Sequence, residues 1–232
     1  MRRLAALFPI VLALGAILVA PRGVQARDSR EGPIKITQCQ TISQPGSYEL
    51  ANNLPPIGVA PPDVCLVITA SFVSIDLAGF TISGPGSAIF AEGKLHGIAV
   101  RNGSISNGGN GVELSSADGA IVEGLRVYII GQFATVGISA NGIIKNNTVT
   151  GSRGTGISAT GIVTGNYAFG NRIFNIEAGQ GSTVIGNTTT GSEISGIVVA
   201  CPSNVTDNTA TGSSQNLVLN GEGCNNTNNV AP

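Results

Sequence analysis

Short phrases of alternating apolar and polar residues recur along most of the chain. Each phrase begins with an aliphatic residue, passes through a turn that contains Gly or Asn, and ends on a β-branched or small residue. The phrases are Leu77–Ile82, Val100–Ile105, Val122–Val127, Ile144–Val149, Val163–Ala168, Val184–Thr189 and Val205–Ala210. Because their starts are evenly spaced along the chain, the pattern repeats about every 21 residues, a period typical of solenoid proteins.

A second phrase recurs between the first ones, so each repeat contains two or three short strands. Its copies are Gly111–Leu114, Gly137–Ala140, Gly156–Ala159, Asn175–Ala178, Gly196–Val199 and Asn216–Leu219. Strands of this length between Gly and Asn turns predict an all-β fold. A leucine-rich repeat is excluded because the chain has no Leu-x-x-Leu-x-Leu frame. We therefore predict a single-stranded right-handed parallel β-helix of about seven coils, stacked about 4.8 Å apart.

Stacking gives a reason for the residue at each position of the first phrase. The first position is always aliphatic, from Leu77 to Val205, and is expected to point inward. The fourth position is Asn on four consecutive coils, at Asn147, Asn166, Asn187 and Asn208. Asn tolerates left-handed backbone, and its amide can bond the amides above and below. These residues are expected to form an asparagine ladder at a turn.

The composition excludes several classes of protein. Hydrophobic residues make up 42% of the chain, which is too many for a disordered protein. The 33 glycines, with many Asn, Thr and Ser, disfavour a helical bundle. A formal net charge of −1 argues against a nucleic-acid binder, which would need a basic face.

The N-terminal segment has the pattern of a secretory signal peptide. Arg2 and Arg3 precede an apolar stretch, and Val24-Gln25-Ala26 offers small residues for cleavage after Ala26. The alternative is a transmembrane anchor, but the stretch is short for a span of about 20 residues and contains Pro9. We expect a secreted or periplasmic protein with no membrane segment after cleavage. The expected segments are the signal peptide (1–26), an N-terminal capping segment (27–70), the β-helix repeats (71–228) and a tail (229–232).

Three N-terminal stretches carry a family resemblance. Cys39–Leu54, Cys65–Thr69 and Val73–Ile82 resemble the opening of secreted bacterial right-handed β-helix proteins, which include the pectate-lyase-like superfamily and carbohydrate-binding and sugar-hydrolase modules. The resemblance covers nearly all of residues 34–228 and specifies the fold better than the function. It implies activity on polysaccharides. Lyases of this fold hold Ca²⁺ with clustered acids and use an Arg or Lys base, whereas hydrolases use two carboxylates.

The chain offers only weak candidates for such chemistry. They are Asp76, Arg101, Glu123 and Lys145, the last three of which stand at the second position of the phrase on consecutive coils. A turn or capping role is the alternative for Asp76, and a stacked ion-pair ladder that also includes Arg126 is the alternative for the others. His96 is either a general base or a solvated loop residue. We expect no cofactor and no metal, except Ca²⁺ in the case of a lyase.

Three functions are consistent with these residues. The first is binding of a polysaccharide or cell-surface glycan without cleavage. The second is a minimal polysaccharide lyase or glycoside hydrolase, and the third is a structural or adhesive solenoid. Sugar-binding surfaces often contain exposed aromatic rings, and the candidates are Tyr128, Phe133, Tyr167, Phe169 and Phe174.

The four cysteines all follow the signal peptide, which favours disulfides over free thiols. Cys39 and Cys65 are separated by close to one period, and so are Cys201 and Cys224. Residues one coil apart lie within the Cα distance that a disulfide requires. The other pairings would join opposite ends of the solenoid. We therefore predict the bridges Cys39–Cys65 and Cys201–Cys224, with four buried free thiols as the alternative.

Overall fold

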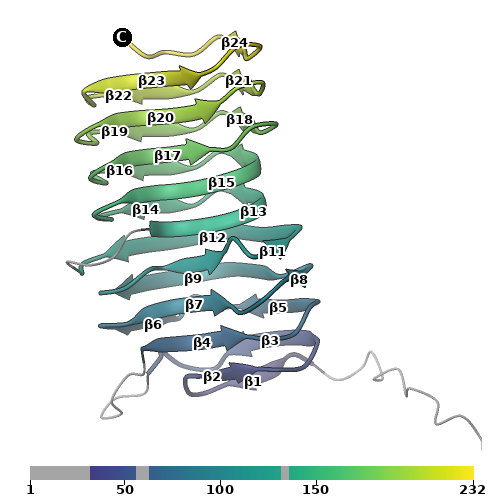
Figure 1. Cartoon of the computed structure of the whole chain (residues 1–232). Coiled ribbons are helices and arrows are strands. Elements are labelled where there is room, and N and C mark those ends of the chain that lie inside the picture. The colour runs from purple at the N-terminus through teal and green to yellow at the C-terminus, as the bar shows by residue number, and fades with distance from the viewer. Residues whose placement is uncertain (1–31, 56–62, 132–135) are drawn as a thin grey trace, which may run out of the picture. The chain divides into compact units, whose positions relative to one another are not determined.

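The computed structural model describes residues 32–55, 63–131 and 136–232, and the predicted signal peptide lies outside them. Residues 32–232 form one compact unit. None of the residues that the structure describes is helical. Parallel strands stack into a β-solenoid of about eight turns with a period of about 21 residues, which confirms the expected fold (Figure 1).

The strands of the coils lie on three faces, which we name A, B and C, and the strands of face C begin at β6 (Thr81–Gly84). Face A contains β2 (Gln40–Ile42), β4 (Val64–Ile68), β7 (Ser87–Ala91), β10 (Val112–Leu114), β17 (Phe174–Ala178), β20 (Ser195–Ala200) and β23 (Gln215–Asn220). Face B contains β1 (Ile34–Ile36), β3 (Gly46–Leu50), β5 (Val73–Asp76), β18 (Thr183–Ile185), β21 (Asn204–Thr206) and β24 (Asn225–Thr227). Face C contains β6 (Thr81–Gly84), β14 (Thr148–Thr150), β16 (Tyr167–Phe169), β19 (Thr188–Thr190) and β22 (Thr209–Thr211).

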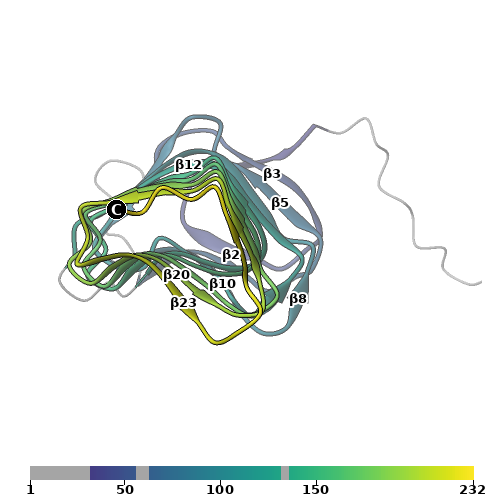
Figure 2. The ribbon, with the colours of Figure 1, turned by 90° about the horizontal axis from the view of Figure 1, so that it is seen from above.

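Four long strands turn a corner and belong to two faces. β9 (Ala99–Asn107) and β12 (Ala120–Ile129) run from face B to face C, and β13 (Val136–Lys145) and β15 (Thr155–Thr164) run from face A to face B. A separate two-stranded sheet joins β8 (Leu95–His96) to β11 (Ala117–Asp118). Seen along the solenoid axis, the coils superpose around a common interior (Figure 2).

The interior is filled by aliphatic residues stacked in register. On face B the inward row contains Ile75, Val100, Val122, Ile144, Val163, Val184 and Val205, all fully buried. The row differs from the expected one at its first member, because Ile75 rather than Leu77 pairs with Val100. The corner after β5 holds Ala78 and Gly79 with φ values of 49° and 82°, and these extra residues shift the start of the phrase. Leu77 is nevertheless fully buried, in that corner.

The expected asparagine ladder occupies the corner between faces B and C. Asn147, Asn166 and Asn187 each donate from Nδ2 to the Oδ1 of the next asparagine at 3.0 Å. Asn208 extends the ladder to Asn229, at 2.8 Å. The left-handed backbone belongs to the preceding position instead, for example Asn146 (φ 56°) and Asp207 (φ 56°). The ladder residues are buried, and their amides satisfy backbone groups of the adjacent coils.

Each cysteine pair joins two neighbouring coils, and the two pairs lie near opposite ends of the described solenoid. The Sγ atoms of Cys39 and Cys65 are 2.08 Å apart, and those of Cys201 and Cys224 are 2.07 Å apart. Their Cα atoms are separated by 4.5 and 5.0 Å. These are the pairings expected from the coil spacing. Strands β1 to β4, within the segment 27–70, already pair in parallel with later coils.

Candidate functional site

The candidate residues from the sequence lie in one outward row on face B. Register pairing aligns this row over six successive coils as Lys35, Glu49, Asp76, Arg101, Glu123 and Lys145. The row contains three cations and three anions. Arg126 does not belong to it, because Arg126 lies on face C.

Every member of this charged row has an ion-pair partner within the row. Lys35 pairs with Glu49, Arg101 Nε lies 3.1 Å from Asp76 Oδ2, and Lys145 Nζ lies 2.6 Å from Glu123 Oε2. Each pair joins neighbouring coils, where stacked opposite charges stabilise the sheet surface. The four candidate catalytic residues therefore take part in two ion pairs that also have a structural role.

Asp76 also holds the turn that follows β5. Its Oδ1 accepts a hydrogen bond from the Ala78 amide at 2.8 Å, and its Oδ2 accepts one from Asn102 Nδ2 at 3.1 Å. Burial acts to raise the pKa of Asp76. The hydrogen bonds from Ala78, Asn102 and Arg101 and the charge of Arg101 outweigh this effect, so that the pKa lies below its ordinary value. A carboxylate held ionised in this way is suited to capping a turn.

His96 faces an acid on the neighbouring coil. β8 and β11 bring His96 Nδ1 within 3.8 Å of Asp118 Oδ2, with both side chains exposed. In the described parts of the chain, no group of three or more His, Cys, Asp and Glu residues could hold a metal ion. No helix among the described residues is long and apolar enough to cross a bilayer.

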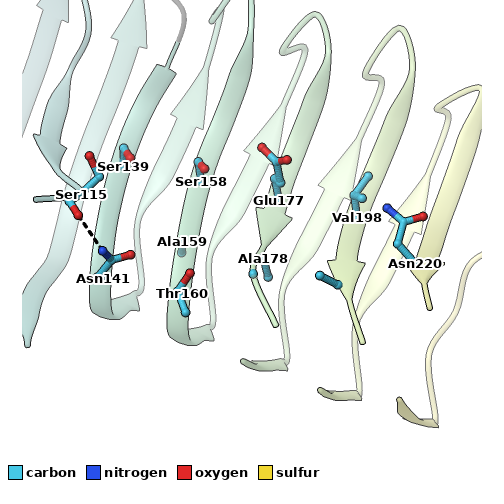
Figure 3. Close-up of a pocket in the computed structure, with 12 residues that line it drawn as sticks. Ser115, Ser139, Asn141, Ser158, Ala159, Thr160, Glu177, Ala178, Val198 and Asn220 are labelled. Atoms are coloured by element: carbon cyan, nitrogen blue, oxygen red, sulfur yellow. Dashed lines mark hydrogen bonds between the residues drawn. The ribbon is translucent and has the colours of Figure 1, made fainter. Parts of the chain in front are cut away.

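A hollow lined by described residues lies where face A turns toward face B. It has a volume of about 260 Å³. We name it the polar trough (Figure 3). Its lining residues are Ser115, Ser139, Asn141, Ser158, Ala159, Thr160, Glu177, Ala178, Gly179, Val198, Ala200 and Asn220.

Two longitudinal rows of side chains form the walls of the trough. One wall follows the outward positions of the strands, where Ser139, Ser158 and Glu177 are in register on consecutive coils. The other wall follows the ends of the strands, where Asn141 pairs in register with Thr160. Figure 3 shows these rows side by side, with Asn141 Nδ2 donating to the Ser115 carbonyl at 2.6 Å.

The floor of the trough consists of small residues. Between the two walls run the strand positions of Ala159 and Ala178, whose side chains belong to the buried core, and Gly179 follows Ala178 without a side chain. From Ser115 to Asn220 the lining residues come from six successive coils, which corresponds to about 24 Å along the solenoid axis. The trough can therefore accept an extended chain parallel to the axis, with hydroxyl, amide and carboxylate groups at the spacing of the coils.

Sequence reasoning did not find the trough. The residues of one wall stand at the third position of the second phrase, as Ser139 does in Gly137–Ala140, and those of the other wall, such as Asn141, directly follow the phrase. The available signal is an outward polar residue in each repeat. Every strand with a solvent-exposed side shows this pattern, so it does not distinguish a binding site.

The aromatic candidates are distributed over different faces. Tyr128, Tyr167 and Phe169 lie together on face C. Phe174 lies on face A and is half-buried, and Phe133 is outside the described residues.

Comparison with known proteins gives a distant similarity in structure. No protein-family model and no curated protein matches the chain. Among solved structures, the chain is similar to the Dettilon tailspike protein, with 14% sequence identity and a TM-score of 0.34. The similarity covers 80% of this chain and 60% of the tailspike chain, so this chain spans less than two thirds of that protein. The β-solenoid is established by the pairing of its own strands, and membership of the pectate-lyase-like superfamily stays a prediction.

Proposed function

We propose that this protein is an exported β-solenoid that binds a polysaccharide or cell-surface glycan along the polar trough without cleaving it. The observation that carries the proposal is the shape and lining of the trough, which crosses six coils and has polar groups on both walls. A linear sugar polymer repeats its hydroxyl groups along its length, as the trough repeats its hydrogen-bonding groups along the axis.

Both chemistry and location support a sugar ligand. Ser139, Ser158 and Thr160 carry hydroxyls that donate and accept, and Asn141 and Asn220 carry amides that do both. The small floor leaves room for a ring to approach the backbone. The two disulfides indicate an extracellular or periplasmic protein, the compartments in which a glycan of the cell surface is accessible.

The distribution of acids favours binding over hydrolysis. A glycosidase needs two carboxylates about 5 to 9.5 Å apart. Among the residues that line the trough, Glu177 is the single acid. Glu113 occupies the same outward row three coils away, at about 14 Å between Cα atoms. It accepts a hydrogen bond from Asn110 Nδ2 at 3.1 Å. This arrangement supports a role for Glu177 in orienting a bound sugar, and it does not support a catalytic pair of carboxylates.

The proposal is tested by binding of the purified disulfide-bonded protein to a glycan array, followed by calorimetry with the best ligand. Glu177→Gln replaces the carboxylate of one wall with a neutral amide, and Asn141→Ala removes the amide of the other wall; each should weaken binding about fivefold, the effect of one hydrogen bond. Glu113→Gln is the matched control, because it makes the same change in the same row outside the lining and should bind as the parent does. Equal affinity in all four proteins would overturn the assignment to the trough, and release of reducing ends or unsaturated uronates would overturn binding without cleavage.

A further inference from the structure

Face C carries a compact group of side chains unlike the rest of that face. On the part of β12 that lies on face C the outward residues are Arg126 and Tyr128, and on β16, two coils later, they are Tyr167 and Phe169. We name these four residues the aromatic patch. The strand between them, β14, contributes Thr148 and Thr150 in register.

The three rings of the aromatic patch lie on the surface of the sheet. The intervening inward residues, Val127, Val149 and Ala168, are buried, so the neighbours on either side point outward. Tyr128 is 54% exposed and Tyr167 is 41% exposed. The Tyr167 and Phe169 rings stack, with centroids 4.9 Å apart.

The remaining outward positions of face C are small and polar. They are Thr81, Ser83, Ser104, Ser106, Thr148, Thr150, Thr188, Thr190, Thr209 and Thr211. Packing between strands therefore does not require aromatic rings on this face, because Ser and Thr occupy the equivalent positions on the other coils. Exposed rings gathered at one point on such a surface are typical of a binding site.

Arg126 differs from the cations of the solenoid that form ion pairs. Arg101, Lys145 and Arg172 each have a carboxylate partner within 4 Å. Arg126 donates from Nε to Ser104 Oγ at 3.4 Å, and it forms no ion pair with any carboxylate of the described residues. The outward positions of face C named above include no acid. The aromatic patch is thus a locally cationic surface on a protein whose formal net charge is −1.

We infer that the aromatic patch is a second binding site, specific for a sugar chain that carries anionic groups. The C–H faces of a pyranose ring are apolar and pack on exposed aromatic rings. The Arg126 guanidinium binds a sulfate, phosphate or carboxylate substituent through charge-assisted hydrogen bonds. Tyr128 and Phe169 stand in one row two coils apart, about 10 Å, so that one chain can contact both rings.

This site is independent of the polar trough and takes a different ligand. The trough contains the carboxylate of Glu177, which repels an anionic chain, whereas the aromatic patch contains an unpaired cation. The two surfaces belong to different faces, A and C, so that binding at one does not require the other.

The test compares dextran sulfate with neutral dextran, which has the same backbone, and uses hyaluronate as the carboxylate-bearing chain. Binding of the disulfide-bonded protein is measured by calorimetry in low and high salt. The parent protein should bind one or both anionic polymers at least tenfold more tightly than dextran. Arg126→Gln should weaken this binding about tenfold and reduce its salt dependence, and Tyr128→Ala and Tyr167→Ala should each weaken it about fivefold.

The controls separate the patch from net charge and from the trough. Lys94→Gln removes an exposed cation elsewhere, and Phe72→Ala removes a ring that is 68% exposed outside the patch; both should bind as the parent does. Glu177→Gln should not weaken binding of the anionic polymer, whereas it should weaken the trough ligand. The inference is overturned if Lys94→Gln weakens binding of the anionic polymer as much as Arg126→Gln does, or if no variant of the aromatic patch weakens it. It is also overturned if dextran binds the parent protein as tightly as dextran sulfate does. Unchanged thermal unfolding of each variant shows that a loss is local.

Discussion

Asp76 Oδ2 and Arg101 Nε lie 3.1 Å apart, although the residues are separated by 25 positions in the chain. Their strands, β5 and β9, place them in register on neighbouring coils of face B. Asp76 also accepts hydrogen bonds from the Ala78 amide and from Asn102. The carboxylate therefore links a turn of one coil to two residues of the next.

This link predicts a loss of stability in acid. Because the pKa of Asp76 is lower in the folded protein than in the unfolded chain, its contribution is complete above about pH 4 and is lost as the pH falls through the folded value. Asp76→Asn should cost up to about 1 kcal/mol at pH 7, the range of a surface ion pair. Its free energy of unfolding, from urea titrations between pH 2 and 7, should depend less on pH than that of the parent. If the free energy of unfolding of Asp76→Asn varied with pH as that of the parent does, Asp76 would not be a source of the loss of stability in acid.

The sequence was sufficient to predict the coil and most of the residues that stack in register on successive coils. Val100, Val122 and Ile144 were aligned correctly because the period and the inward aliphatic position reinforce each other. The alignment failed at Leu77, where extra corner residues with positive φ change the coil length without a change in composition. The asparagine ladder also extends to Asn229, in the predicted tail, on a coil where Asn226 stands in register with the aliphatic Val205.

The surfaces were much harder to predict than the coil. An aliphatic residue inside a solenoid is required at each repeat, whereas outward positions tolerate many residues, so that Ser139 or Thr160 carries no distinctive signal. The partner of Arg101 was also missed, since the alignment that started at Leu77 did not bring Asp76 into the row. Three-dimensional register was needed to bring Arg126, Tyr128 and Tyr167 onto one face.

The asparagine ladder should be a sensitive point of the fold. Asn187 is buried, donates to the Val163 carbonyl and to Asn208 Oδ1, and accepts from Asn166. Asn187→Ala removes these bonds and leaves buried partners unsatisfied, so we expect a loss of about 2 to 4 kcal/mol in urea unfolding.

An exposed asparagine provides the control for the ladder. Asn225→Ala on β24 should cost less than about 0.5 kcal/mol. A similarly small effect for Asn187→Ala would mean that the ladder amides contribute little net stability.

The C-terminal disulfide should protect the last coils. Cys201–Cys224 joins the segments after β20 and before β24, near one end of the described solenoid. Replacing both cysteines with serine should cost about 3 kcal/mol in the chain-entropy model. Amide hydrogen exchange should accelerate in β23 and β24 and stay slow in β13 and β15. The corresponding Cys39/Cys65 variant should instead accelerate exchange in β1 to β4, and acceleration in the same strands for both variants would contradict a local effect.

Gly103 should tolerate no side chain. It is buried at the corner of β9, and an added Cβ would stand 2.3 Å from Leu77 Cβ and 2.8 Å from the Phe80 carbonyl oxygen. Neither atom can rotate away, so Gly103→Ala should destabilise the protein by about 2 kcal/mol or more. Gly32→Ala is the control, because nothing lies within 4 Å of the added atom. Thermal unfolding compares the two, and equal melting temperatures would show that the corner can relax.

Gly179 offers a way to block the polar trough while the solenoid stays folded. It lies on the floor of the trough beside Thr160, and an added Cβ would stand 2.4 Å from Thr160 Oγ1. That oxygen is the end of an exposed side chain that can rotate, and the next atoms are 3.4 and 3.6 Å away. Gly179→Leu should therefore retain the β-sheet circular dichroism spectrum and lose about 1 kcal/mol or less of stability. Because its side chain occupies the space between the walls, binding of the trough ligand should fall at least tenfold in calorimetry. Binding of dextran sulfate at the aromatic patch should be unchanged, and undiminished binding of the trough ligand would mean that the glycan lies elsewhere on the solenoid.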